Sequence, residues 1–221
     1  LAEYGQREMA GDERPQGQES NADRFLRVVT QQLDFHGDQE TYHDPRNSLL
    51  PDVLERHMGL PIMLCLVCIA VGRRIGMQIW GLGFPNHFLA LHRDAEGDTI
   101  LDPFLGITLA PSEVERHLAR MTGRPVQLAP DAWRAQSAQE IAVRILHNLR
   151  NAYLTAKDLE MVRRVLDYLI AANSAEPQYW RERGLIHYRE GRWVDAHYDL
   201  RRYLVRVGLL GTAAAPDEPG A

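Results

Sequence analysis

The chain has 221 residues, of which 45% are hydrophobic and 25% charged, and a formal net charge of −5 at pH 7. These values are ordinary for a globular protein of one large or two small domains, and the acidic balance argues against a general nucleic-acid binder. No signal peptide or membrane-spanning run is visible, and the first residue is Leu1 rather than Met, which leaves room for a missing N-terminal piece. The two cysteines, Cys65 and Cys68, lie in one apolar stretch, so we expect a cytoplasmic protein rather than a disulfide-stapled secreted one.

The first part of the chain predicts two short helices joined by a long irregular segment. Residues 21–23 can cap the first helix, whose apolar residues at helical spacing are Phe25, Leu26, Val29 and Leu33. The segment 35–47 follows, and loops of that length tend to be functional or held by specific contacts. We expect Ser48 to cap the second helix, which ends near Gly59. Its inner face is predicted to hold Leu50, Val53 and Leu54.

The stretch 61–75 predicts a central buried helix. Every side chain from Ile62 to Val71 is apolar or a thiol, so such a helix has no face left for water. Pro61 suits the first helical position, where its missing N–H costs nothing. Basic residues and a stop are supplied at the other end by Gly72, Arg73, Arg74 and Gly76.

After this helix the sequence is typical of antiparallel strands. Strands are predicted at 78–84, 87–92 and 99–103, with a turn at 94–98. A helix followed by such strands predicts an α+β fold. The mixed segment 106–138 is expected to contain a helix at 111–121 and then a loop, because Pro125 and Pro130 interrupt regular structure.

From Gln139 onward the chain is helical and repeats itself with a period of 34 residues. The shift superposes Leu146 on Trp180, Tyr153 on His187, Leu159 on Trp193, Val162 on Ala196 and Leu166 on Leu200. This period is that of the tetratricopeptide (TPR) repeat. Because two repeats leave apolar faces uncovered, we expect the pair to pack on the first domain or on a partner.

His87 and Asp102 are the best candidates for a catalytic pair. A four-residue loop at 93–96 places them directly opposite each other on adjacent strands, whereas a tighter turn centred on Glu96 and Gly97 separates them by several residues. The spacing leaves both registers open. The structural alternative is a satisfied strand histidine and an aspartate that begins a turn.

The remaining chemistry-bearing residues indicate no further site. Cys65 and Cys68 have redox-motif spacing, but both lie inside an apolar helix, where a packing role is favoured. The other histidines, including His36, His43 and His57, show no ligand spacing. The sequence therefore predicts no metal site and no cofactor.

Six ordered motifs resemble the SirB-type bacterial transglutaminase-like proteins. They are LDFHGD at 33–38, YHDPRNS at 42–48, VLER at 53–56, GLPI at 59–62, GFPNHF at 83–88 and ILDPF at 100–104. With the TPR pair, which those proteins also carry, the resemblance covers about residues 21–206. It implies a papain-like core, in which a central buried helix packs on an antiparallel sheet and an active enzyme uses Cys, His and Asp.

The resemblance places His87 and Asp102 in two of these roles, but Pro61 stands where the nucleophilic cysteine is expected. It therefore implies a non-catalytic binding or regulatory protein. Cys65 lies one helical turn further in, about 6 Å along the axis. One alternative is a cysteine-dependent acyl transferase or amidase using Cys65, His87 and Asp102. Another is a hydrolase in which the histidine and aspartate activate water.

The motif at 42–48 is expected to be ordered and to form one wall of the cleft beside His87. Asn47 is predicted to satisfy internal polar groups and Arg46 to meet an anion at the cleft. Tyr42 and Asn86 complete the expected binding residues. We expect the partner to be a protein or peptide, with no nucleic acid and no membrane.

The motifs and the repeat together predict three parts of the chain. A transglutaminase-like domain is expected at 1–138, a TPR-like domain of two helical hairpins at 139–208, and a disordered tail at 209–221.

Overall fold

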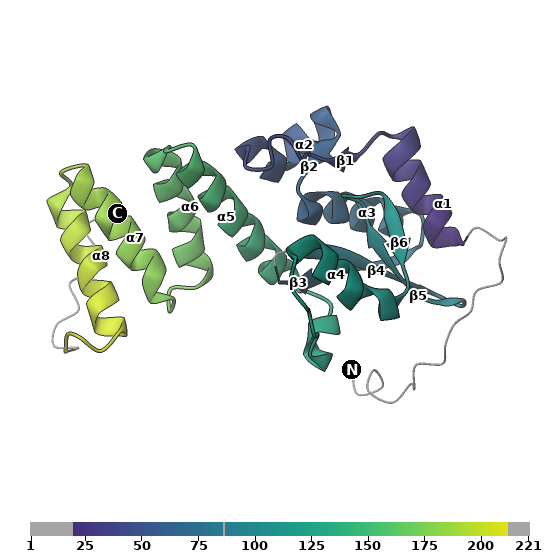
Figure 1. Cartoon of the computed structure of the whole chain (residues 1–221). Helices are drawn as coiled ribbons and strands as arrows, with labels where there is room; N and C mark the ends of the chain where they lie inside the picture. The colour runs from purple at the N-terminus through teal and green to yellow at the C-terminus, as the bar shows by residue number, and fades with distance from the viewer. Residues whose placement is uncertain (1–19, 86, 212–221) are drawn as a thin grey trace. The chain divides into compact units, whose positions relative to one another are not determined.

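The computed structural model describes residues 20–85 and 87–211 (Figure 1). Within the described residues, the chain divides into two compact units, with the main boundary between Ser137 and Ala138 and the short segment His43–Pro45 assigned to the second unit. The first unit mixes helices with an antiparallel sheet and the second is all helical, so the predicted fold class is confirmed. Most of the predicted tail, 212–221, lies outside the described residues.

The first helix, α1 (Asn21–Arg27), is capped by Ser20. The Ser20 hydroxyl accepts a hydrogen bond from the Asp23 N–H, and the Asp23 carboxylate accepts one from the Ser20 N–H, both at 3.1 Å. The chain continues as a π-helical turn, η1 (Val28–Gln32). Leu33, the last of the apolar residues at helical spacing, is 44% exposed and lines a surface pocket together with Phe25 and Val29.

The second helix, α2 (Leu50–Arg56), differs from the prediction at its cap and its face. A 3-10 turn, η2 (Pro45–Ser48), precedes it, so Leu49 rather than Ser48 occupies the cap position. Leu50 and Leu54 are 45% and 48% exposed, and Val53 alone is fully buried. Gly59 packs directly against Val53, so closely that a Cβ at Gly59 would lie 2.9 Å from Cγ2 of Val53. This contact buries one residue of the helix, Val53. The short parallel ladder of β1 (His36–Gly37) and β2 (Met58–Gly59) fixes this contact.

The predicted central helix is α3 (Pro61–Arg74), with Pro61 at its first position. The first part of the helix is buried as expected, including Cys65 and Cys68, with only Leu66 half-buried. Its second part does have a face toward water, because Ala70 is exposed and Val71 is half-buried. Gly72 is not part of the stop as predicted, because a Cβ there would lie 2.5 Å from Cδ1 of Ile79. It allows the sheet to approach the helix closely. The chain turns at Gly76, whose φ is +81°.

The sheet of the first unit runs β3 (Gln78–Phe84), β4 (His87–Asp94), β5 (Gly97–Asp102) and β6 (Ile107–Leu109), each strand antiparallel to the next. Asp94 pairs with Gly97, so the turn between β4 and β5 has two residues, Ala95 and Glu96. This register matches neither of the two considered from the sequence. Asp102 therefore lies opposite Leu89, two residues from His87.

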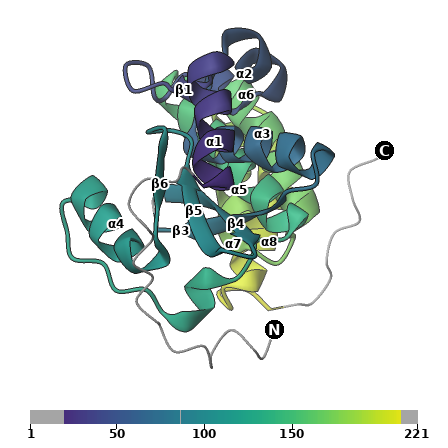
Figure 2. The ribbon, with the colours of Figure 1, turned by 90° about the vertical axis from the view of Figure 1, so that its right-hand side faces the viewer.

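Helices cover both faces of this sheet (Figure 2). Helix α4 (Val114–Thr122), in the position predicted, packs its Val114 and Leu118 against a cluster that includes Leu82, Leu89 and Ile100. Helix α3 covers the other face, on which Ile79 and its cross-strand partner His92 lie. Because side chains alternate along a strand, the odd-numbered residues of β4 face α4 and the even-numbered ones face α3.

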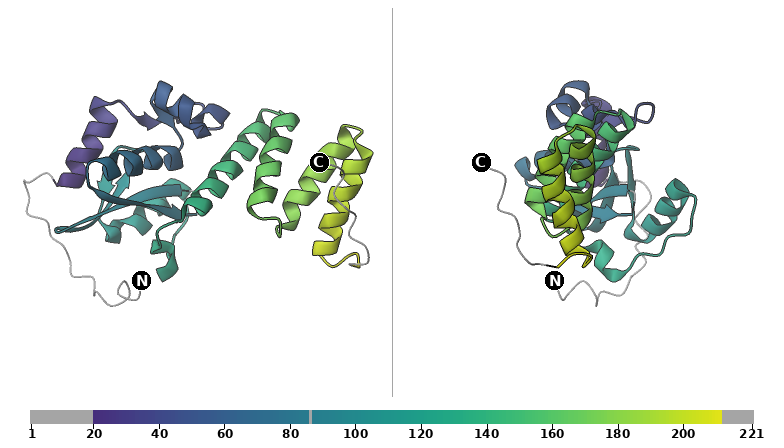
Figure 3. Two further views of the ribbon diagram at one scale, coloured as in Figure 1. Left: turned by 180° about the vertical axis from the view of Figure 1, so that it is seen from behind. Right: turned by 90° about the vertical axis from the view of Figure 1, so that its left-hand side faces the viewer.

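The second unit consists of two helical hairpins, as the repeat predicts (Figure 3). Helix α5 (Ala138–Thr155) packs on α6 (Leu159–Ala172), α6 on α7 (Pro177–Arg189), and α7 on α8 (Trp193–Arg206). A Cβ at Gly184 would lie 2.9 Å from Cγ of Leu200, so this glycine permits the close approach of α7 and α8. In the described part of the chain, every helix is too short or too polar to cross a bilayer.

Candidate functional site

His87 and Asp102 lie at adjacent ends of two strands and touch. His87 is the first residue of β4 and Asp102 the last of β5. Since Asp102 faces Leu89 across the ladder, His87 is its diagonal neighbour on the same face of the sheet. Nε2 of His87 lies 3.0 Å from Oδ2 of Asp102. The two-residue turn thus brings the candidate pair together through a diagonal contact.

A third residue, His117, joins the pair, and the sequence analysis missed it. Its Nε2 lies 2.9 Å from the same oxygen, Oδ2 of Asp102. His117 is buried on the face of α4 that carries Val114 and Leu118. One signal could have found it: a histidine at helical spacing with buried apolar residues needs a polar partner in the core.

Asp102 is fully buried and accepts four hydrogen bonds. Its Oδ1 accepts from the N–H groups of Phe104, at 3.1 Å, and Leu105, at 3.2 Å. Burial acts to raise the pKa of the Asp102 carboxyl, but the hydrogen bonds of His117, His87 and the backbone outweigh it and lower the pKa to about 2. Because an ionised carboxylate only accepts, both histidines must carry their hydrogen on Nε2.

A cleft with a volume of about 470 Å³ opens beside His87. Its lining residues are Tyr42, Pro61, His87, Phe104, Met121, Thr122 and Arg124. Pro61, the first residue of α3, therefore stands on the cleft together with the histidine. In this arrangement the position expected for a nucleophile holds a side chain without a reactive atom.

The two thiols lie elsewhere. Cys65 and Cys68 are both fully buried, and burial raises the pKa of the Cys68 thiol to about 12. The Cys65 Sγ donates to the main-chain oxygen of Phe88 at 3.6 Å, and α3 covers the opposite face of the sheet from the one that carries His87. The structure therefore brings Asp102 but not Cys65 to His87.

The segment 42–48 supplies both a cleft residue and an internal polar network. Tyr42 lines the cleft and packs edge-on against Phe104, with ring centroids 6.1 Å apart. Asn47 is fully buried and donates to Oδ2 of Asp38 at 3.0 Å and to the Thr41 carbonyl at 2.8 Å. Nη1 of Arg56 donates to Oδ1 of the Asn47 side chain at 3.0 Å.

The expected cation of the cleft is a different arginine. Arg46 is exposed and is not among the cleft residues, because η2 turns its neighbours Asn47 and Ser48 inward and leaves Arg46 on the outside. Arg124, just after α4, lines the cleft instead. Asn86, the fourth predicted binding residue, lies outside the described residues.

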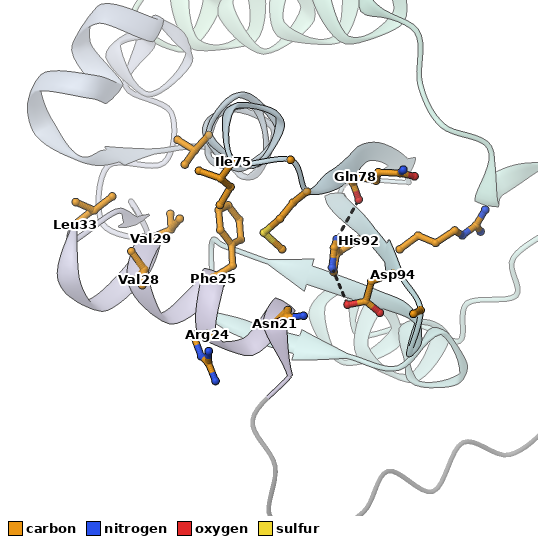
Figure 4. Close-up of a pocket in the computed structure, with 15 residues that line it drawn as sticks. Asn21, Arg24, Phe25, Val28, Val29, Leu33, Ile75, Gln78, His92 and Asp94 are labelled. Atoms are coloured by element: carbon orange, nitrogen blue, oxygen red, sulfur yellow. Dashed lines mark hydrogen bonds and ion pairs between the residues drawn. The ribbon is translucent and has the colours of Figure 1, made fainter.

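A larger pocket of about 830 Å³ lies on the α3 face, beside α1 (Figure 4). Its walls are largely apolar and include Phe25, Val29 and Ile75. Its buried polar group is His92, held between the Gln78 carbonyl, 3.1 Å from Nδ1, and the Asp94 carboxylate, 3.2 Å from Nε2. Since none of the predicted site residues lines this pocket, the cleft beside His87 is the candidate site.

Comparison with known proteins identifies the class to which this fold and cleft belong. Residues 2–147 match the profile of the transglutaminase-like superfamily, and residues 149–221 match that of the tetratricopeptide repeat. The chain therefore belongs to the transglutaminase-like superfamily and carries a C-terminal TPR region. No solved structure matches the chain significantly.

The bacterial relatives narrow the family. A "UPF0162 protein" of Xylella fastidiosa (strain Temecula1) is 35% identical over 187 residues, which are 80% of this chain and 65% of the relative. One of Vibrio cholerae is 29% identical over 164 residues, 74% of this chain and 61% of that protein. The chain thus spans less than two thirds of the length of these relatives. The matches confirm that the chain resembles the SirB-type family, as the motifs predicted. Mouse "F-box only protein 21" is 35% identical over 74 residues, 33% of this chain and 12% of that protein.

Proposed function

We propose that this chain is a non-catalytic transglutaminase-like protein that binds a protein or peptide in the cleft beside His87. The observation that carries the proposal is that Pro61 and His87 line the same cleft. In a cysteine acyl transferase the thiol must face its base at the helix N-terminus. Here proline occupies that position, while His87 keeps its contact with Asp102.

The cysteine-dependent alternative has one specific observation in its favour, the His87–Asp102 contact of 3.0 Å. Cys65 would have to leave a fully buried site and its contact with the Phe88 carbonyl to reach that pair. A nucleophile that is not held beside its base loses most of the rate acceleration that correct orientation provides. The third candidate is a hydrolase in which His87 and Asp102 activate water. Its activity would not depend on Cys65.

The lining of the cleft favours a ligand with an apolar part and a negative charge. Tyr42, Phe104 and Met121 offer apolar surface. Arg124 offers a guanidinium for which no ion pair occurs within the described residues. We therefore expect a peptide in which an aromatic or aliphatic side chain lies near a carboxylate.

The TPR region agrees with a protein partner, since such repeats stack into extended surfaces that bind other proteins. The proposal also includes a cytoplasmic location, because cysteines are ordinarily kept as thiols there.

Peptide selection on the immobilised chain tests the binding function, followed by fluorescence polarisation with the selected peptides. Arg124→Ala should weaken binding at least about tenfold, the equivalent of one charge-assisted hydrogen bond. Arg46→Ala is the matched control, because this exposed arginine lies off the cleft. Peptides that bind the Arg124→Ala and Arg46→Ala variants equally would contradict the proposal.

Amine incorporation into a glutamine peptide, together with amide hydrolysis, tests the absence of catalysis. The wild-type chain and Cys65→Ala should both stay at background. Turnover by the wild type that Cys65→Ala abolishes would establish the acyl transferase. Turnover that survives Cys65→Ala and is lost in His87→Ala would establish the hydrolase.

A further inference from the structure

The family resemblance and the binding proposal account for His87 and Asp102, but not for His117, which completes a set of three possible metal ligands. His87, Asp102 and His117 come from β4, β5 and α4, and all three are buried. They are the one group of three potential metal ligands found in the described part of the chain, with ligand atoms within 4.8 Å of one another. We propose that this cluster binds a single divalent transition-metal ion.

The distances suit an ion of the size of Zn²⁺. Bonds from zinc to imidazole nitrogen and carboxylate oxygen are about 2.0–2.2 Å, so ligands at angles between a right angle and the tetrahedral value lie about 2.9–3.4 Å apart. The Nε2 atoms of His87 and His117 lie 3.0 Å and 2.9 Å from Oδ2 of Asp102. Two edges of a coordination polyhedron are therefore already present.

The carboxylate is oriented for this role by the backbone. The N–H groups of Phe104 and Leu105 hold Oδ1 of Asp102, which leaves Oδ2 directed at the two imidazoles. Such outer hydrogen bonds fix a ligand in metal sites.

Metal binding requires a change of tautomer in both histidines. Without metal, each Nε2 carries the hydrogen that it donates to Asp102. To present a lone pair to the ion, each neutral imidazole moves this hydrogen to Nδ1. The ion then replaces two hydrogen bonds by three coordinate bonds.

The proposed metal site adjoins the cleft. Three protein ligands leave at least one position of a four-coordinate ion for water or another group. His87 is both a proposed ligand and a residue that lines the cleft, so the proposed site lies next to the cleft beside Pro61. Two imidazoles and one carboxylate favour zinc, iron, cobalt or nickel over calcium or magnesium.

Isothermal titration of the untagged, chelator-treated chain with ZnCl₂ tests the site. The wild type should bind one Zn²⁺, and His117→Ala should weaken this binding at least about tenfold. His36→Ala is the matched control, because His36 is exposed and bonds the Asp34 carbonyl instead. Absence of saturable binding by the wild type, or equal affinities of the wild type and His117→Ala, would overturn the proposal.

A measurement on the wild type alone keeps the test independent of whether the variant folds. In proton–nitrogen correlation spectra of the histidine rings, Zn²⁺ should convert two histidines from the Nε2–H to the Nδ1–H tautomer. With Co²⁺, the same chain should develop a visible absorption band of a bound ion. Zinc that perturbs only exposed histidines, such as His36, would refute the assignment of the ligands.

Discussion

The thiol of Cys65 lies 3.6 Å from the main-chain oxygen of Phe88, on the α3 side of the sheet. The residue before Phe88 in the sequence is His87, whose side chain points to the other side, toward Asp102 and α4. Phe88, whose main-chain oxygen the thiol contacts, is therefore the next residue after His87. The sheet nevertheless lies between the side chains of Cys65 and His87.

We expect the native thiols to react slowly and a thiol at position 61 to react fast. Cys65 and Cys68 are fully buried, so an aromatic disulfide reagent should label them at least about 100-fold more slowly in buffer than in denaturant. Position 61 is also buried, but it lines the cleft at a helix N-terminus, so the new thiol of Pro61→Cys should be labelled faster than Cys65 and Cys68.

The dependence of this labelling on His87 distinguishes a preserved cleft from mere exposure. Adding His87→Ala to Pro61→Cys should slow the reaction, whereas adding His36→Ala should leave the rate unchanged. Rapid labelling of the wild-type chain would contradict the burial of Cys65 and revive the cysteine-enzyme alternative.

The second prediction concerns Asp102 and acid stability. The folded pKa, about 2, is below the usual value of 3.8, so the ionised group stabilises the fold above pH 4 and loses this contribution as the pH falls toward 2. Asp102→Asn should therefore lower the free energy of unfolding at pH 7 by about 2 kcal/mol. In urea titrations at several pH values, the difference between wild type and variant should shrink between pH 4 and 2. A constant difference would show that the charge of Asp102 is not responsible.

Periodicity in the sequence predicted most helices and strands, but not the contacts between elements that are distant in the sequence. The apolar run of α3 and the 34-residue repeat each describe one element or one pair of neighbours, and both are found in the structure. His117 reaches Asp102 only because α4 packs across the sheet, a long-range contact that no local spacing encodes. For the same reason, the inward or outward direction of Arg46 depended on η2, a turn without a distinct signal.

A third prediction uses two neighbours in that turn. Asn47 is fully buried and bonded to Asp38, Thr41 and Arg56, so Asn47→Ala should lower the free energy of unfolding by about 2–3 kcal/mol. The Ser48 hydroxyl is also buried, but it has no hydrogen-bond partner within the described residues. Ser48→Ala should therefore be neutral or slightly stabilising. Equal losses for both variants in urea titrations would refute the importance of the network.

The last prediction compares the same turn in the two repeats. Lys157 and Gly191 are 34 positions apart, lie between paired helices, and have φ values of 59° and 73°. A left-handed conformation costs a residue with a Cβ about 1 kcal/mol, which glycine avoids. Gly191→Ala should therefore destabilise the TPR unit by about 1 kcal/mol. Lys157→Gly should stabilise it by somewhat less, because glycine also increases the entropy of the unfolded chain.

Thermal or urea unfolding followed by circular dichroism at a helix-sensitive wavelength measures both changes. Space does not account for the expected loss at position 191, since the nearest atom to a Cβ there is Cζ2 of Trp193 at 3.9 Å, an ordinary contact. Gly184→Ala provides the contrast: its Cβ would meet Leu200 at 2.9 Å, so its loss should come from packing and exceed that of Gly191→Ala. Destabilisation of the unit by Lys157→Gly would contradict the prediction. It would mean that contacts of the lysine side chain contribute more stability than its backbone strain removes.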